Sequence, residues 1–240
     1  MPSPARPDEA LLRANRLLSL LPAGVLASLA PSLQLVPLRL RDTLLAEGKP
    51  IRHAWFPTEG VISMLGSVEG AQRPIEIGTV GNEGMAGLPL FLGASRAPGE
   101  CFVQVAGQAW RLPAKALHET VERHPEFARV LHRYTQALMV QLSQSTACNR
   151  AHSPLQRCAR WLLMTRDRVP GDTFELTQEF LGHMLGERRP TVSRAASQLQ
   201  ARGMIAYSRG RITVLDRERL EQCACGCYRV VRGEYDAMLR

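Results

Sequence analysis

Residues 176–205, LTQEFLGHMLGERRPTVSRAASQLQARGMI, constrain the fold of this chain more than any other segment. Thr177 is a good helix N-cap, and the apolar residues after it predict a short amphipathic helix that ends at Gly186. Pro190 suits the first turn of a second helix, because its missing N–H would have no intrahelical partner there. Gly182 would let the second helix cross close over the first. The second helix buries one apolar face, which consists of Val192, Ala195, Ala196 and Leu199. Two short helices joined in this way predict a helix-turn-helix.

The exposed side of this predicted motif is strongly basic. Between residues 187 and 211 there are six arginines and one acid, Glu187. Arginine can donate two hydrogen bonds to a guanine edge, and hydroxyl groups can bind phosphate oxygens. After Gly203, two short strands around a Ser-Arg-Gly turn predict a β-hairpin, which makes the domain a winged helix-turn-helix. The residues predicted to contact DNA are Arg188, Arg189, Thr191, Ser193, Arg194, Arg209 and Arg211.

The first half of the chain has a different residue pattern. Between about residues 35 and 112, the segments WFPTEGVISML, PIEIGTVGNEG, LPLFLGA and CFVQVAGQAWRL alternate with glycine and proline, which predicts a β-sandwich or β-roll. Before it, residues 17–38 contain three prolines and favour two short helices, or a helix and a strand. A short helical piece follows Pro113, and residues 155–169, LQRCARWLLMTRDRV, predict a further amphipathic helix. The expected fold class is therefore α+β.

A long amphipathic helix begins at Pro125. Its apolar positions recur every three or four residues, at Phe127, Leu131, Tyr134, Leu138 and Leu142. The stripe spans only about two heptads, so the sequence leaves two interpretations open: packing on the helix's own domain, or a dimer seam. We predict a two-fold dimer that uses these five residues. The expected domains are a β-roll, a dimerisation helix and a DNA-binding domain, at residues 1–124, 125–153 and 154–240.

The composition agrees with a polyanionic partner. The 240 residues carry a formal net charge of +8, and the pI is about 9.7. Of 30 basic residues 28 are arginines, and they are spread along the chain. The total charge alone therefore does not locate a binding face, and the position of each arginine has to be considered. Six cysteines without a secretory leader predict a reducing, cytoplasmic location. The prolines within residues 17–38 argue against a membrane span, so no membrane partner is expected.

The β-rich first half, the long helix and the motif LTQEFLGHMLGERRPTVSR together resemble the Crp/Fnr superfamily of bacterial transcription regulators. The resemblance covers nearly the whole chain and implies a cyclic-nucleotide-binding-type β-roll (jelly roll), a dimerisation helix and a C-terminal winged helix-turn-helix. It implies a homodimer that binds double-stranded DNA, with RNA polymerase and a small-molecule effector as further partners, and no enzyme activity. The family's base-reading positions fall on Arg189, Pro190 and Arg194. Members that respond to cyclic AMP have glutamate at the middle position, so their operator sequence is not expected here.

The stretch GNEGMAGLPLFLGASRAPGE corresponds to the family's cyclic-nucleotide cassette and departs from it. An ungapped match places Gly87 at the ribose-binding glutamate and Ala97-Pro98 at the phosphate-binding pair. Glu83 and Arg96 lie nearby and are the candidate ligand-binding residues. We therefore expect no tight binding of cyclic AMP.

The cysteine-rich segment CACGC, residues 223–227, superficially suggests a metal site. We expect it on one helix that runs from Asp216 through Tyr235. On such a helix Cys225 points roughly 200° away from Cys223, so the three thiols cannot share one ion. Members that sense oxygen hold an iron–sulfur cluster on N-terminal cysteines, and this chain has none before Cys101. The sequence therefore predicts inert cysteines, with no metal and no cofactor.

A second class of function remains open from sequence. The chain could be a ligand- or redox-sensing module that acts mainly through protein–protein interaction. The main prediction is a homodimeric, sequence-specific transcription regulator whose β-roll senses an effector of unknown identity.

Overall fold

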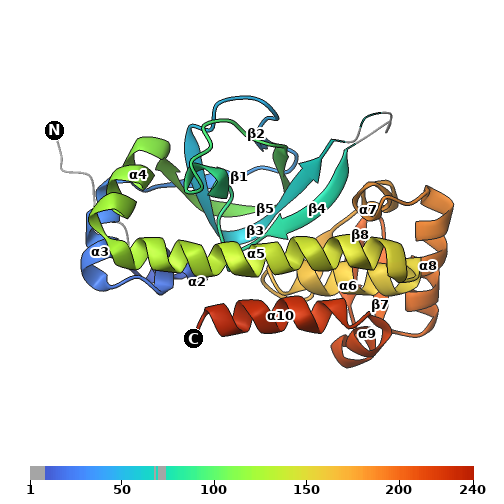
Figure 1. The fold of residues 1–240 in the computed structure, drawn as a ribbon. Helices are drawn as coiled ribbons and strands as arrows, with labels where there is room; N and C mark the ends of the chain where they lie inside the picture. The colour runs from blue at the N-terminus through green and yellow to red at the C-terminus, as the bar shows by residue number, and fades with distance from the viewer. Residues whose placement is uncertain (1–8, 68, 70–73) are drawn as a thin grey trace. The chain divides into compact units, whose positions relative to one another are not determined.

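The computed structural model describes residues 9–67, 69 and 74–240. The chain forms two compact units, which are described separately below. The first comprises the described residues up to Met64, Thr79–Leu138 and Tyr235–Arg240, and the second comprises the described part of Leu65–Gly78 together with Met139–Glu234. Four of the elements in Figure 1 contribute residues to both units: β3 (His53–Gly66), β4 (Ile75–Val80), α5 (Pro125–Ala151) and α10 (Cys227–Met238). The predicted boundaries at residues 124 and 153 stay a prediction.

A five-stranded sheet forms the centre of the β-roll. Its order is β1-β5-β3-β4, with β2 also paired to β5, and β1 and β2 both run antiparallel to β5. The strands are β1 (Gln34–Leu38), β2 (Thr43–Leu45), β3 (His53–Gly66), β4 (Ile75–Val80) and β5 (Glu100–Pro113). Three of the four segments predicted as β-structure are these long strands β3, β4 and β5.

The fourth predicted segment, LPLFLGA, is not a strand. Gly87 precedes it in the left-handed region with φ 97°, and Pro89 stands in the first turn of a short 3₁₀ helix, η2 (Leu88–Leu90). Proline supplies no backbone N–H for a sheet and suits the first turn of a helix, which explains the difference. The prediction of β-structure there was wrong.

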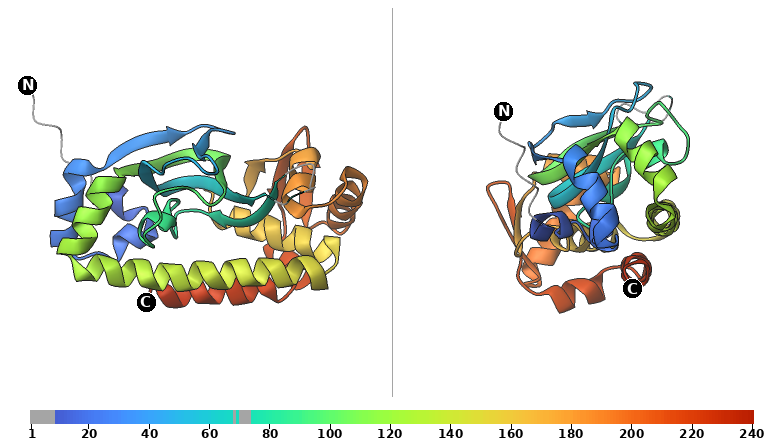
Figure 2. Two further views of the ribbon diagram at one scale, coloured as in Figure 1. Left: turned by 45° about the horizontal axis from the view of Figure 1, so that its top comes forward. Right: turned by 90° about the vertical axis from the view of Figure 1, so that its left-hand side faces the viewer.

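Helices close the first unit on one side, where Figure 2 shows α3 (Ala23–Leu29) beside α4 (Ala114–Arg123). Ser28 on α3 is 3.2 Å from the His124 ring nitrogen Nε2 at the end of α4. The sequence left open whether residues 17–38 form two short helices or a helix and a strand, and the segment contains both short helices and a strand. The helices are α1 (Glu9–Arg13), α2 (Arg16–Ser19), α3 (Ala23–Leu29), the 3₁₀ helix η1 (Ala30–Ser32) and α4 (Ala114–Arg123).

The long helix α5 (Pro125–Ala151) forms where the sequence predicts it. Its side chains Phe127, Leu131 and Tyr134 are fully buried in the first unit. The Tyr134 hydroxyl donates to the carbonyl of Met85 at 2.9 Å, and its ring lies against Gly84. A Cβ at Gly84 would overlap the Tyr134 ring, so glycine is required at this position. The loop after β4 is thereby packed directly on α5.

The second unit contains a winged helix-turn-helix, as predicted. Three strands form its small sheet in the order β6-β8-β7, and both pairs are antiparallel. The elements are α6 (Pro154–Arg166), β6 (Thr173–Glu175), α7 (Gln178–Leu185), α8 (Arg189–Ala201), β7 (Ile205–Ser208), β8 (Arg211–Val214), α9 (Arg217–Cys223) and α10 (Cys227–Met238), of which the residues from Tyr235 onward belong to the first unit. Ser153 begins α6 with a reciprocal capping box to Gln156.

The predicted continuous helix from Asp216 through Tyr235 is wrong. Helix α9 ends at Cys223, Ala224 is extended (φ −68°, ψ 156°), and α10 begins only at Cys227. The helical hydrogen bonds are interrupted in the CACGC segment. The angle of roughly 200° that an unbroken helix would place between Cys223 and Cys225 therefore does not apply. The expected α+β fold, with a β-roll, a long helix and a winged helix-turn-helix, is confirmed. None of the described helices combines the length and hydropathy needed to cross a membrane.

Candidate nucleic-acid interface

Local signals position the first helix of the pair and the turn after it. The Thr177 hydroxyl oxygen accepts a hydrogen bond from the Phe180 N–H at 3.1 Å, and Gly186 ends α7 in the left-handed region (φ 62°, ψ 31°). A Cβ at Gly182 would lie 3.1 Å from the carbonyl oxygen of Glu187. Gly182 therefore permits the turn after α7 to pass close to that helix. The next neighbour of such a Cβ is the Val192 side chain of α8, at 3.8 Å.

Helix α8 has a sharply divided surface. Its apolar face is buried, and Val192 and Leu199 are fully inaccessible. Arg188, Arg189 and Arg194 are exposed on the other side, and within the described part of the chain none of these guanidinium groups has an ion-pair partner. Their charges therefore remain available to an anionic partner.

The single acid of this segment is turned inward. Glu187 forms an ion pair of 2.9 Å with Arg157, which is buried on α6. Arg157 also donates to the Leu185 carbonyl, so it ties the turn between α7 and α8 to α6. Because the buried Arg157 neutralises Glu187, this carboxylate does not offset the positive charge of the exposed arginines at the start of α8. Sequence reasoning did not identify Arg157.

Thr191 and Ser193, the two hydroxyl residues of α8 that were predicted to contact DNA, are half-buried. Ser193 donates to the Gln178 side-chain oxygen at 2.5 Å, so its proton is already used within the motif, whereas the Thr191 side chain makes no hydrogen bond to a described residue. Gln178 is thus a further polar residue at this surface. Its position directly after the N-cap, in the first turn of α7, was the available sequence signal.

The wing is a tight hairpin with an arginine at its tip. Ser208 pairs with Arg211, so the loop contains only Arg209 and Gly210, and both have positive φ (49° and 77°). This is the pattern of a type I′ turn. Gly210 also accepts a hydrogen bond from the Leu176 N–H at 2.7 Å, which anchors the wing next to the N-terminus of α7. Arg209 and Arg211 are exposed and have no ion-pair partner among the described residues.

Comparison with known proteins agrees with this geometry. Residues 156–223 match the Crp-like helix-turn-helix domain. FixK2 from Bradyrhizobium japonicum is 17% identical and aligns over 81% of this chain and 98% of its own, with a TM-score of 0.69. The chain has the Crp/Fnr fold. A Crp-family transcriptional regulator from Thermus thermophilus is 20% identical over 79% of this chain and 96% of its own, with a TM-score of 0.64.

A second Thermus thermophilus regulator, of the Crp/Fnr family, is 19% identical over 80% of this chain and 98% of its own, with a TM-score of 0.63. A search of curated protein sequences returned no match. The predicted resemblance to the Crp/Fnr superfamily is confirmed by the shared fold and by the Crp-like domain.

The two candidate ligand-binding residues of the β-roll lie in different surroundings. Glu83 is only 4% exposed and accepts a hydrogen bond from the Gly81 N–H at 3.1 Å, inside its own loop. Arg96 is exposed and donates to the Gly48 carbonyl at 2.8 Å. No hydrogen bond or ion pair joins Arg96 to Glu83 in the described chain.

The residues predicted as a dimer seam are used within the chain itself. Phe127, Leu131, Tyr134 and Leu138 are at most 4% exposed, and Leu142 is half-buried. The apolar stripe of α5 therefore fills the chain's own core, the other interpretation that the sequence left open. The opposite face of α5 carries Met139, which is 59% exposed.

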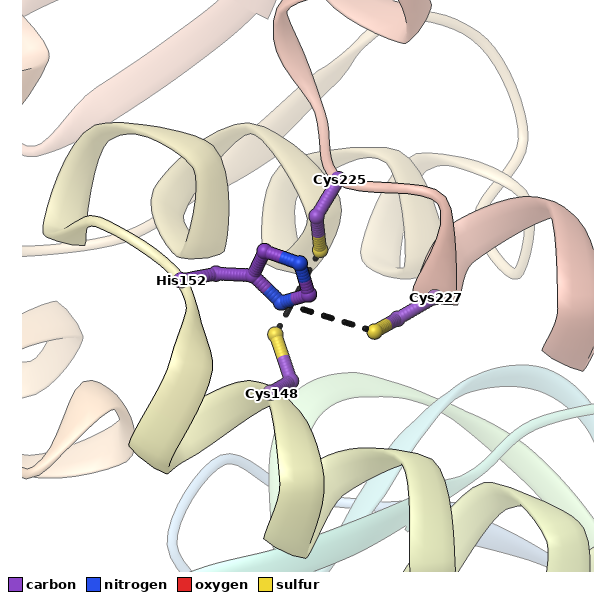
Figure 3. A group of neighbouring side chains, drawn as sticks. All are labelled: Cys148, His152, Cys225 and Cys227. Atoms are coloured by element: carbon purple, nitrogen blue, oxygen red, sulfur yellow. Dashed lines mark hydrogen bonds between the residues drawn. The ribbon is translucent and has the colours of Figure 1, made fainter.

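Four residues that the sequence did not group converge in the second unit. The ligand atoms of Cys148, His152, Cys225 and Cys227 all lie within 4.8 Å of one another (Figure 3). A hydrogen bond from the Cys148 thiol lowers the pKa of Cys225 to about 5. Burial instead raises the pKa of the Cys158 thiol, which lies outside this group, to about 12.

Proposed function

We propose that this protein is a homodimeric, sequence-specific DNA-binding transcription regulator. The observation that carries the proposal is the divided surface of α8. It buries Val192 and Leu199 and exposes Arg189 and Arg194, which have no ion-pair partner among the described residues. In a helix-turn-helix the second helix enters the major groove with its N-terminal residues at the base edges. In this proposal the protein acts in the cytoplasm, has RNA polymerase as a further partner and is not an enzyme.

The arginines have two roles in the proposed complex. Arg189 and Arg194 read guanine edges, because a guanidinium group can donate to O6 and N7 together. Arg188, Arg209 and Arg211 contact phosphates, as does Thr191, and these contacts supply affinity without sequence information. Ser193 acts indirectly by holding Gln178, since its hydroxyl hydrogen bonds to that side chain.

We propose that the dimer forms through the outward face of α5. At roughly 100° per residue, His132, Gln136 and Ser143 lie on the same face as Met139. This face is exposed in the single chain, whereas the stripe at Phe127 and Leu131 is buried. A two-fold dimer predicts an inverted-repeat DNA site with half-sites about 34 Å apart.

The effector is proposed to act through the loop that packs on α5. Asn15 donates to the Gly84 carbonyl at 2.9 Å, and Tyr134 of α5 holds the same loop through Met85. A ligand that moves this loop would therefore displace a residue of α5. Glu83 is committed to the loop backbone, so we expect no tight binding of cyclic AMP in calorimetry. Micromolar affinity would show that Glu83 and Arg96 rearrange to bind it.

The test is a binding-site selection from random duplex DNA with the wild-type protein and the Arg194→Ala variant at one salt concentration. The wild type should select an inverted repeat. The variant should bind that site about 1–3 kcal/mol more weakly and lose base preference at one position of each half-site. An unchanged motif would remove Arg194 from base reading.

The matched control is Arg229→Ala. Arg229 is also exposed but lies on α10, outside the Crp-like domain, so it removes the same charge without touching α8. Equal losses in both variants would mean that only the total charge matters. If the wild type selects no motif, sequence-specific binding is contradicted and the protein–protein sensor becomes the better account.

A further inference from the structure

The cysteine and histidine group of the second unit comes from two distant parts of the chain. Cys148 lies in the last turn of α5, and His152 follows that helix with its N–H bonded to the Cys148 carbonyl at 3.1 Å. This helical spacing of four residues places both side chains on one side. Cys225 and Cys227 flank Gly226 in the segment that joins α9 to α10. Figure 3 shows the four side chains pointing toward a common centre.

The separations fit a single metal ion. The Cys148 and Cys225 sulfurs are 3.4 Å apart, and the Cys227 sulfur is 3.7 Å from Nδ1 of His152. Sulfur ligands bound tetrahedrally at about 2.3 Å from one ion stand about 3.8 Å apart. In an iron–sulfur cluster the protein ligands are divided among two or more iron atoms, so some of them stand farther apart than the 4.8 Å within which all four ligand atoms lie here.

The surroundings supply a compensating charge. The three cysteines are at most 5% exposed, so an ion held by three thiolates and a neutral imidazole would bury a net negative charge. Arg160 of α6 is only 6% exposed and acts electrostatically on Cys148, Cys225 and Cys227. Its Nε has no hydrogen-bond partner among the described residues. A buried arginine with a spare N–H is a suitable neighbour for metal-bound thiolates.

We propose that Cys148, His152, Cys225 and Cys227 form a structural zinc site. The donor set of three sulfurs and one nitrogen is one that structural zinc sites use, with four protein ligands and no open position. Soft thiolate ligands also disfavour magnesium and calcium.

The position of the four ligands suggests what the ion does. Two ligands precede the Crp-like domain at residues 156–223, and two follow it. One ion would therefore join both ends of that domain. Closing a loop of this length by a metal restricts the unfolded chain more than the folded one, so the ion should stabilise the domain.

The experiment measures the metal content of the full-length protein, purified under reducing conditions, by inductively coupled plasma mass spectrometry. We expect about one zinc per chain in the wild type and in Cys223→Ser, and near-complete loss in Cys225→Ser. Cys223 is the matched control because it lies two residues away and outside the group of four. Removing zinc with a chelator should lower the melting temperature of the wild type.

The wild type alone also tests the site, in case a variant fails to fold. Cobalt(II) added to the chelated protein should give the absorption of a tetrahedral thiolate complex, which zinc then abolishes. Wild-type protein with neither zinc nor this cobalt spectrum would overturn the proposal. Iron with acid-labile sulfide would assign a cluster instead. A Cys148–Cys225 disulfide in metal-free protein that is purified in parallel without reductant, from cells where zinc is supplied, would assign a redox pair. Either result contradicts a zinc site.

Discussion

At the residue scale, the wing tip combines an unfavourable backbone with an exposed charge. Arg209 has φ 49°, in the left-handed region that costs a residue with a side chain about 1–2 kcal/mol. Asparagine and glycine are favoured in such turns. Arginine at this position therefore does not stabilise the fold, which agrees with phosphate binding as its role.

We predict that Arg209→Asn separates folding from DNA binding. The variant should keep or raise the melting temperature, because asparagine tolerates the left-handed region, and it should weaken specific and non-specific DNA binding alike. The slope of log affinity against log salt should become shallower by about 0.9 for each phosphate that the variant no longer neutralises, and a dimer has two such phosphates. Arg209→Ala should lose the same affinity with no gain in stability. Unchanged binding by the asparagine variant would exclude a role for Arg209 in phosphate binding.

At the scale of elements, the loop after β4 and helix α5 form one packed unit. Gly84 leaves room for the Tyr134 ring, and the Tyr134 hydroxyl bonds to Met85. Asn15 holds the same loop from the N-terminus of α2 by hydrogen bonds to the carbonyls of Pro57 and Gly84. This packing links the β-roll directly to the long helix.

We predict that Gly84→Ala destabilises the protein by about 1–3 kcal/mol, because the new methyl group would overlap the fully buried Tyr134 ring. Chemical denaturation measures the change. In Gly24→Ala the new methyl group meets no atom of the described residues within 4 Å, and in helix α3 it should add about 0.5–1 kcal/mol to the stability. Tyr134→Phe should cost about 1 kcal/mol through the missing hydrogen bond. A neutral Gly84→Ala would show that the loop can move freely away from α5.

At the scale of the whole molecule, the proposed dimer depends on which face of α5 is free. The core already uses Phe127, Leu131 and Leu138, so an aspartate there would unfold the chain rather than separate two copies. Met139 is 59% exposed and lies on the outward face.

We predict that Met139→Asp shifts the protein from dimer to monomer at micromolar concentration, because two carboxylates would face each other near the two-fold axis. Light scattering measures the mass. Val230→Asp is the control, since Val230 is a 48% exposed apolar residue on α10. Its variant should stay dimeric. A wild type that is monomeric without DNA, or a dimeric Met139→Asp, would contradict this seam.

Much of the winged helix-turn-helix could be read from the sequence, because its signals are local. Thr177, Gly182, Gly186 and Pro190 act within one or two turns of their own positions, and the period of the apolar residues reports which face of α8 is buried. The exposed arginines follow from that same period. The inward pairing of Glu187 with Arg157 could not be predicted, because 30 residues separate them.

Sequence alone determined the fold class, the long helix and the basic face of α8, since each depends on periodicity or on turn chemistry along a short stretch. Only the tertiary structure decided which partner covers the apolar stripe of α5, because periodicity marks a buried face and not what buries it. It also decided that the sulfurs of Cys148 and Cys225, 77 residues apart, lie 3.4 Å from each other. Their proximity requires the break between α9 and α10 and the folding of the whole Crp-like domain between the two cysteines, neither of which a local pattern records.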